Sequence, residues 1–150
     1  GLPVLGFGLG AQILAQAAGG GSQATPFEFK MMKAARVAHE AAAAFLPEEF
    51  HIVHYGRGRA LPPPAARTLA QDVDGNPLAF QIGDNSFGFA GHPGVKSGII
   101  EDLIMEFEDG PDDAIPQLNE LRAAHRDIEN SLAKIMVGLV QRTGWMQAGK

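Results

Sequence analysis

A glycine-rich segment near the start of the chain, GFGLGAQ at residues 6–12, has the spacing of a turn that exposes a catalytic nucleophile. Such an elbow between a strand and a helix needs small residues two positions before and after the exposed one, and these are Gly6 and Gly10. The N–H groups that begin the helix can lower the pKa of a thiol and hold an oxyanion. The exposed position is Gly8, which has no side chain. The segment is therefore a nucleophile elbow without its nucleophile, or an ordinary glycine-rich turn.

A histidine that could act as a general base lies in a second segment, FGFAGHPG at residues 87–94. A strand that runs into His92 can hold the imidazole rigidly at the edge of a sheet. A carboxylate two positions further on would orient that imidazole as in a catalytic triad, but Gly94 stands there. In the strand itself, Phe87 and Phe89 share one face, and the glycine between them leaves the other face open to close approach. Taken alone, a histidine at the end of a strand is more often structural or simply exposed.

The composition excludes several kinds of chemistry. The 150 residues include no cysteine, so the chain has no disulfide, no thiolate metal site and no thiol nucleophile. The spacings of its five histidines match no zinc pattern, and we expect neither a metal nor another cofactor.

Charge and hydropathy also restrict the partners. A net charge of −5 works against a general affinity for nucleic acid or anionic lipid. No apolar run reaches the ~18 to 20 residues that span a bilayer, so no membrane association is expected. The first 18 residues faintly resemble a signal peptide but lack its basic leader, and their glycines fit a strand–turn–helix better. We therefore expect a cytoplasmic protein.

The apolar and glycine patterns predict the elements that would position these residues. A short apolar strand should precede the elbow and a helix should follow it, while two strands joined by a tight turn should lead to His92. The alanine-rich stretch 27–45 is expected to be mostly helical. Along the chain we expect strands at 2–7, 50–54, 79–82 and 87–90, helices at 11–18, 95–107 and 117–144, and a linker at 108–116.

The length of the chain suits a single domain that spans residues 1–150. A strand–turn–helix at the start, a β-rich middle and helices at the end predict an α/β domain. The predicted strands are too few for a doubly wound sheet that is complete in itself.

Together the two glycine-rich segments resemble the class I glutamine amidotransferases, in which a GxCxGxQ elbow supplies a cysteine and an FHPE segment supplies a histidine and a glutamate. Between them the chain has His51 and His54, then the Leu61–Pro62 pair, then residues 78–93, in the order that the family shows. The resemblance covers roughly residues 2–107 and is most similar to the glutaminase part of GMP synthase. It implies a flavodoxin-like, three-layer fold with a mostly parallel sheet, flanking helices and its N-terminal strands missing. The chain would then correspond to the C-terminal two-thirds of the family domain.

The same resemblance assigns the site residues. The nucleophile of the family falls on Gly8 and its glutamate falls on Gly94, so that His92 is the remnant of the triad. Gly8, Leu9 and Gln12 would line the substrate pocket, although Gln12 is as readily explained as an exposed polar residue on the first turns of a helix. The family's thiolate forms a glutamyl thioester and releases ammonia, which glycine cannot do.

We therefore expect a pseudoenzyme: a degenerate glutamine amidotransferase-like protein without the catalytic cysteine, which acts as a non-catalytic binding, scaffolding or regulatory subunit. Its partner would be another protein chain or a second copy of itself, and its candidate ligand is glutamine or a related amide. The alternative is an amidotransferase or amide hydrolase of altered mechanism, in which His92 works with residues from a missing N-terminal half or from a partner chain.

Overall fold

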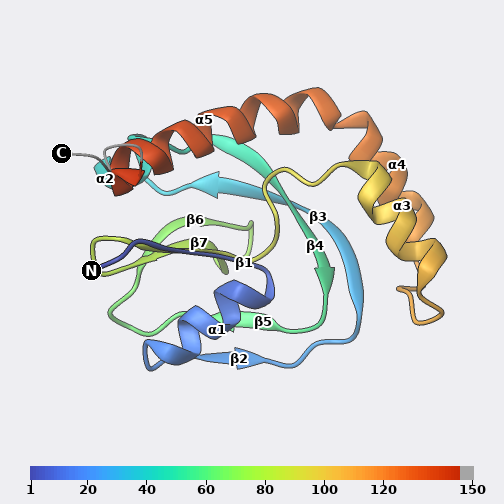
Figure 1. Cartoon of the computed structure of the whole chain (residues 1–150), viewed down its shortest axis with the longest axis horizontal. Helices are drawn as coiled ribbons and strands as arrows, with labels where there is room; N and C mark the ends of the chain where they lie inside the picture. The colour runs from blue at the N-terminus through green and yellow to red at the C-terminus, as the bar shows by residue number, and fades with distance from the viewer. Residues whose placement is uncertain (146–150) are drawn as a thin grey trace.

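Five helices and eight strands make up residues 1–145, the part of the chain that this computed structural model describes (Figure 1). Six strands form one sheet in the order β1-β8-β7-β6-β3-β4, and β2 pairs with β5 in a small second sheet. In chain order the elements are β1 (Val4–Phe7), α1 (Leu9–Ala17), β2 (Gly21–Gln23), β3 (Glu28–Arg36), α2 (Glu40–Ala43), β4 (Glu49–Gly56), β5 (Arg59–Leu61), β6 (Arg67–Gln71), β7 (Pro77–Ile82), β8 (Ser86–Phe89), α3 (Ser97–Glu106), α4 (Ala114–Ala123) and α5 (His125–Thr143).

The direction of the strands differs from the expectation. Within residues 1–145, β1 and β8 are the one parallel pair of the six-stranded sheet, and its other four neighbouring pairs are antiparallel. The α/β class with flanking helices is confirmed, whereas the expected mostly parallel arrangement is corrected. The reason is that residues 72–76 join β6 to β7 and residues 83–85 join β7 to β8. Adjacent strands that are joined by such short turns run in opposite directions.

Helices cover both faces of the large sheet, and each face has its own core (Figure 1). Helix α5 lies over one face together with α2, and helix α1 lies over the other face together with β2 and β5. A third cluster joins β3 and β4 to α3 and α4. Large side chains fill the core on the first face, which includes Phe45, Phe87, Phe89, Ile135 and Leu139. Small side chains let α1 approach the second face, where the core includes Ala11, Ala15 and Phe80. The third cluster includes Phe29, Val53, Ile100 and Leu118.

The alanine-rich stretch 27–45 is mostly strand, not helix. It contains β3, which pairs with β4 along eight residues, and only then the four-residue helix α2. The helix propensity of alanine is therefore overridden, because β3 gains backbone hydrogen bonds from β4 and, at its end, from β6. Its burial pattern has the alternation of a strand near Ala34, which is buried between exposed Lys33 and Ala35.

The predicted C-terminal helix is two helices. Helix α4 begins at Ala114, inside the expected linker 108–116, and the chain turns at Ala124 before α5 begins. Leu118 and Leu121 of α4 lie against β3 and α3, in one cluster with Ile128 from the start of α5. Beyond the turn, Ile135 and Leu139 of α5 lie against the first face of the sheet.

Two helical glycines should respond in opposite ways to alanine. A Cβ atom at Gly138 in α5 would lie 2.0 Å from the Cβ atom of buried Phe45, whereas one at Gly98 in α3 would have no atom within 4 Å. Gly138→Ala should therefore lower the free energy of unfolding by about 1–3 kcal/mol, as overpacked cores do. Gly98→Ala should raise it by up to about 1 kcal/mol, because alanine is the better helix former. Urea denaturation measures both, and stabilisation by Gly138→Ala would contradict this packing.

Candidate functional site

The two glycine-rich segments meet because β1 and β8 are parallel neighbours. The carboxyl ends of parallel strands lie at the same edge of a sheet, and Phe7 is paired with Phe89 at this edge. The N–H of Gly8 donates to the carbonyl oxygen of Phe89 at 3.0 Å. Beyond β8, His92 forms an isolated bridge with Val53 of β4, through two backbone hydrogen bonds of 2.7 and 2.8 Å. The imidazole of His92 stacks on the ring of Phe7, with 5.0 Å between centroids. The elbow and the histidine therefore share one edge of the sheet.

Gly8 has the backbone conformation of a sharp elbow. Its φ of 52° and ψ of −113° lie where L-amino acids with side chains are strained, and it immediately precedes α1 without capping the helix by a side chain. A Cβ atom at Gly6 would lie 2.7 Å from the backbone carbon and oxygen of Gly10, so Gly6 lets the strand and the helix approach this closely. A Cβ atom at Gly8 itself would have no atom within 4 Å. The turn thus presents position 8 to open space with no side chain on it.

The hydrogen bonding of the His92 imidazole suits a ring that donates a hydrogen bond through Nε2, and not a ring that acts as a general base. The N–H of Gly94 donates to its Nδ1 at 3.1 Å, so the neutral ring carries its proton on Nε2. A triad histidine needs the opposite tautomer, with the proton on Nδ1 and a free Nε2 that can accept. Although the side chain is exposed, desolvation by the residues around it lowers its pKa below the ordinary value, which keeps the ring neutral near pH 7. In this arrangement His92 is not set up to deprotonate a nucleophile.

The space beside Gly94 is occupied by a side chain from another element. A Cβ atom there would lie 2.3 Å from Cδ2 of Leu132, which reaches it from α5. The place where the amidotransferase resemblance expects a glutamate is thus occupied by an aliphatic side chain of another element.

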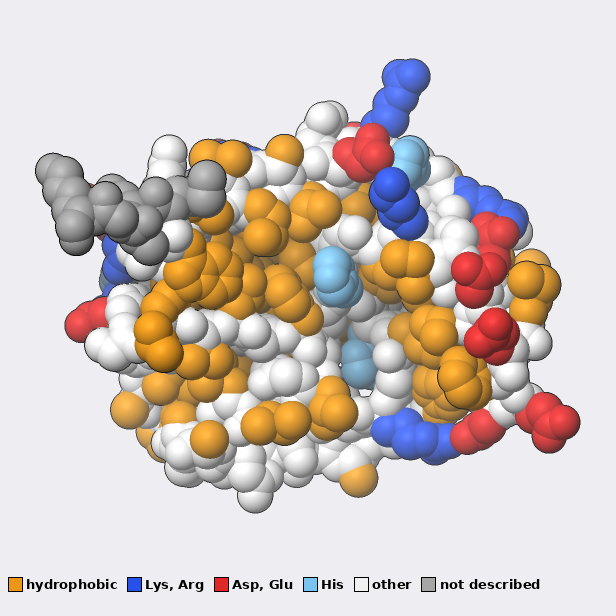
Figure 2. Space-filling view, viewed as in Figure 1, with side chains coloured by type: hydrophobic (Ala, Val, Ile, Leu, Met, Phe, Trp, Pro, Cys, Tyr) orange, Lys and Arg blue, Asp and Glu red, His pale blue; other side chains and the backbone are white. Residues whose placement is uncertain are grey.

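A cavity of about 630 Å³ lies at this edge of the sheet. Gly8, Leu9, Gln12 and His92 all line it, while Gly94 is not among its lining residues. The structure thus brings together four of the five positions that the sequence singled out. Figure 2 shows a hollow in the middle of this face, with histidine side chains and hydrophobic side chains around it.

The side chain of Gln12 is used within the protein. Its Nε2 donates to the backbone carbonyl of Arg57 at 3.1 Å, and its Oε1 lies against Gly58, where a Cβ atom would be 2.5 Å away. Gln12 therefore connects α1 to the loop that follows β4, and this loop forms part of the cavity wall.

Two polar residues of the cavity were not found from the sequence. Tyr55 lines the cavity from β4, and its hydroxyl oxygen is buried with no hydrogen-bond partner among the described residues. Burial raises the pKa of Tyr55, and the negative charge of Asp109 raises it further, so the hydroxyl stays protonated. Arg57 lines the rim, where its Nη2 lies 2.6 Å from Oδ2 of Asp109 and its guanidinium lies 5.0 Å from the ring centroid of Phe27. Alternation along β4 predicts that Tyr55 and Val53 lie on the same face of the strand. It does not predict that this face lies near the elbow at residues 6–12.

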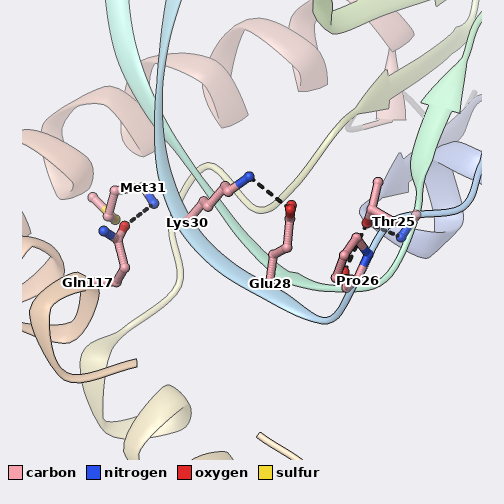
Figure 3. Close-up of polar contacts among 7 residues, drawn as sticks. Thr25, Pro26, Glu28, Lys30, Met31 and Gln117 are labelled. Carbon is pink, nitrogen blue, oxygen red and sulfur yellow. Dashed lines mark hydrogen bonds and ion pairs between the residues drawn. The ribbon is translucent and has the colours of Figure 1, made fainter. Parts of the chain in front are cut away.

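Polar contacts fix the chain at Thr25 and Met31, on either side of the start of β3 (Figure 3). Before β3, Oγ1 of Thr25 accepts a hydrogen bond from the N–H of Gly58 at 2.8 Å. Further along, the N–H of Met31 donates to Oε1 of Gln117 at 2.8 Å, which connects β3 to α4. These contacts hold the chain before and after Phe27, the residue of this segment that lines the cavity.

The described residues hold no cluster of three or more His, Asp or Glu side chains that could bind a metal ion. Along the same residues, no helix combines the length and the apolar composition that crossing a membrane requires.

Acid should destabilise the protein through His54, which is buried in β4 and lines the cavity. Burial lowers its folded-state pKa below the ordinary value of 6.5, against the opposing effects of the Ala90 carbonyl and Glu28. The unfolded chain then binds more protons, so the free energy of unfolding should fall as the pH drops through 6.5. Urea denaturation at pH about 7.5 and about 5.5 should show a smaller loss in His54→Gln than in the wild type.

Comparisons with known proteins give a structural likeness only. No protein-family model matches the sequence, and no curated protein matches it. Among solved structures, a glutamine amidotransferase from Methylobacillus flagellatus is 22% identical with a TM-score of 0.67, over 91% of this chain and 63% of that one. A glutamine amidotransferase from Thermotoga maritima is 18% identical with a TM-score of 0.71, over 94% and 62%. A protein described as part of a GMP synthase from Thermoplasma acidophilum is 20% identical with a TM-score of 0.51, over 85% and 61%.

The chain thus spans just over 60% of the length of these solved structures. At such identities the likeness concerns the fold, and it agrees with the resemblance that the elbow and the histidine segment suggested. The chain has the α/β fold of solved glutamine amidotransferases.

Proposed function

We propose that this chain is a non-catalytic, glutamine amidotransferase-like domain, a pseudoenzyme that acts as a binding, scaffolding or regulatory subunit. The observation that carries the proposal is Gly8. The backbone bends there as an elbow does, at φ 52° and ψ −113°, yet the residue has no side chain and the whole sequence has no cysteine. The frame of a nucleophile is present, and a nucleophile of the amidotransferase type is not.

The state of His92 argues against the alternative of an altered mechanism. A general base would have to accept a proton at a free ring nitrogen, but Nδ1 already accepts from Gly94 and Nε2 carries the proton of the neutral ring. The orienting carboxylate of a triad has no counterpart at position 94, where Leu132 packs. A water molecule activated by His92 would thus lack both a correctly protonated base and its orienting acid.

An apolar edge supports the role in an assembly. Strand β1 is the edge of the six-stranded sheet and pairs only with β8 among the described residues. Val4 in this strand and Leu2 just before it are exposed, and Leu9 and Ile13 are exposed on the adjoining helix α1. Unpaired, apolar edges are places where a further strand can add. We propose that another protein chain or a second copy of this chain covers this edge.

Ammonia release from L-glutamine by the purified chain tests the first part of the proposal. A rate at the buffer background, equal in the wild type and in His92→Ala, is expected. Ammonia release that His92→Ala abolishes would overturn the proposal in favour of the altered-mechanism enzyme.

Native mass spectrometry tests whether a second copy covers the edge. If it does, the wild type should be a dimer that Val4→Asp dissociates, and Val73→Asp, which changes an exposed apolar residue in a turn, should leave the dimer intact. A wild-type monomer would exclude the second copy and leave another protein chain as the partner.

A further inference from the structure

Two places in the chain have an aspartate directly before a glycine, Asp74–Gly75 and Asp109–Gly110. At such a pair the backbone nitrogen of the glycine can attack the side-chain carboxyl carbon of the aspartate. The ring that closes is a succinimide, and the N–H proton leaves with the carboxyl oxygen as water. A second water molecule then opens the ring at either carbonyl, which gives back aspartate or gives isoaspartate. Glycine favours the attack because it has no Cβ atom and its backbone turns freely. Both pairs are exposed, so their hydrogen bonds decide which of them can react.

The first pair lies in the turn between β6 and β7, which several hydrogen bonds hold closed. The N–H of Gly75 donates to the carbonyl oxygen of Asp72 at 3.1 Å, so the nitrogen that would attack is already engaged. Oδ1 of Asp72 accepts from the N–H groups of Asp74 and Asn76 at 3.0 and 2.8 Å. The turn must therefore open before the Gly75 nitrogen can reach the Asp74 carboxyl group.

The second pair lies between α3 and α4, where no such turn holds it. The N–H of Gly110 has no hydrogen-bond partner among the described residues. Oδ2 of Asp109 lies 2.6 Å from Nη2 of Arg57, and the two side chains are 78% and 58% exposed. Ion pairs this exposed are weak, so the carboxylate is free to leave Arg57. Neither the attacking nitrogen nor the carboxyl group is therefore held away from the reaction.

We propose that Asp109 is a site of spontaneous isomerisation to isoaspartate, and that this modification separates it from Arg57. Isoaspartate adds one methylene group to the backbone and leaves its carboxylate on a side chain that is shorter by one carbon. Arg57, which lines the cavity, then loses its ion pair. The inference goes beyond the proposed function, because the modification needs water alone and no activity at the cavity.

Incubation of the folded chain in H₂¹⁸O at neutral pH tests the proposal. Each cycle of ring closure and opening incorporates one ¹⁸O atom, and tandem mass spectrometry of the peptides assigns it to a residue. Label should accumulate at Asp109 at least about tenfold faster than at Asp74, because the hydrogen bonds of the first turn must break before its ring can close. Electron-transfer fragmentation of the same peptides should identify isoaspartate at position 109.

Three variants test the chemistry and the ion pair. Gly110→Ala should fold like the wild type, because a Cβ atom at position 110 has no atom within 4 Å. It should slow labelling at Asp109 by about two- to fivefold, since alanine restricts the backbone more than glycine does. Arg57→Leu removes the ion pair and should speed labelling by up to about fivefold. Arg122→Leu removes a surface arginine that is paired with Glu101, and should not change the rate.

The isomerisation is overturned if Asp109 gains no label, if Asp74 gains it as fast, or if Gly110→Ala is labelled at the wild-type rate. The separation from Arg57 has its own readout in ¹⁵N-labelled protein. The Nε–H signal of Arg57, identified by its absence from Arg57→Leu, should move as the isoaspartate fraction grows. An unchanged signal, or an unchanged labelling rate in Arg57→Leu, would overturn that separation. None of these results depends on ammonia release, which tests the proposed function.

Discussion

Ammonia release from L-glutamine by the purified chain should lie about 10⁶-fold below that of a cysteine-containing amidotransferase of the same fold, a difference of about 8 kcal/mol in barrier height. This is the effect of removing the nucleophile from a catalytic triad, and here position 8 has no side chain while the sequence has no other thiol. A glutamate dehydrogenase-coupled assay measures the release, with the cysteine-containing enzyme as the positive control. A rate within a few hundredfold of that enzyme would contradict the prediction.

Adding a thiol at position 8 should not by itself give glutaminase activity. In Gly8→Cys, iodoacetamide should label one site per chain, because the sequence has no other cysteine and a Cβ atom at position 8 has no atom within 4 Å. The variant should nevertheless stay at the ammonia background, since Nδ1 of His92 accepts from Gly94 and the ring cannot present the tautomer of a base. Turnover by Gly8→Cys alone would show that His92 is competent as a base, and would contradict this tautomer.

A third substitution decides whether the orienting acid can be rebuilt. Gly94→Glu added to Gly8→Cys should lower the free energy of unfolding, because its Cβ atom meets Leu132. Adding Leu132→Ala to these two substitutions should recover part of the lost free energy of unfolding. Ammonia release is then measured in this triple variant.

Phe80→Ala should have the largest effect on stability, about 3–5 kcal/mol, as expected for a buried aromatic side chain that is truncated. Phe80 is 1% exposed and packs with Ala11 and Ala15 of α1, directly behind the elbow. Urea denaturation measures the loss. Phe107→Ala makes the same chemical change at a residue that is 58% exposed, and should stay within about 0.5 kcal/mol of the wild type.

Gly88 provides a second, independent check of that packing. A Cβ atom at Gly88 would lie 2.2 Å from Cζ of Phe80, so Gly88→Ala should be destabilising in the wild type and close to neutral when Phe80 is already alanine. Equal effects in both backgrounds would mean that the two residues do not share this contact. The sequence predicts that the face of Gly88 is open to close approach, and the ring of Phe80 is what approaches it.

The candidate site could be predicted from the sequence where its signals are local. The elbow prediction depends on the spacing of Gly6, Gly8 and Gly10, and the strand predicted at 87–90 depends on Phe87 and Phe89 sharing one face. Both are short-range patterns, and the structure confirms the strand–turn–helix and the strand. The carboxyl ends of β1 and β8 then meet as neighbouring parallel strands do, which places both segments at one cavity.

The rest depends on contacts between residues far apart in the chain. The alanine-rich stretch 27–45 became a strand because β4 pairs with it, and local propensity carries no information about that pairing. Tyr55 and Arg57 line the cavity from the end of β4, near the bridge between Val53 and His92. The contact of Leu132 with Gly94 depends on where α4 turns into α5. No spacing in the sequence marks any of these contacts.

The packing of Leu132 against Gly94 sets an order on evolutionary change in this chain. A carboxylate at position 94 becomes tolerable only after position 132 has become smaller, and a smaller residue at position 132 leaves a gap in the protein until position 94 has grown. Each step is unfavourable unless the other has already occurred. Whether position 94 can accept a carboxylate is therefore contingent on position 132, and selection for stability acts against the first of the two changes, whatever residue stands at position 8.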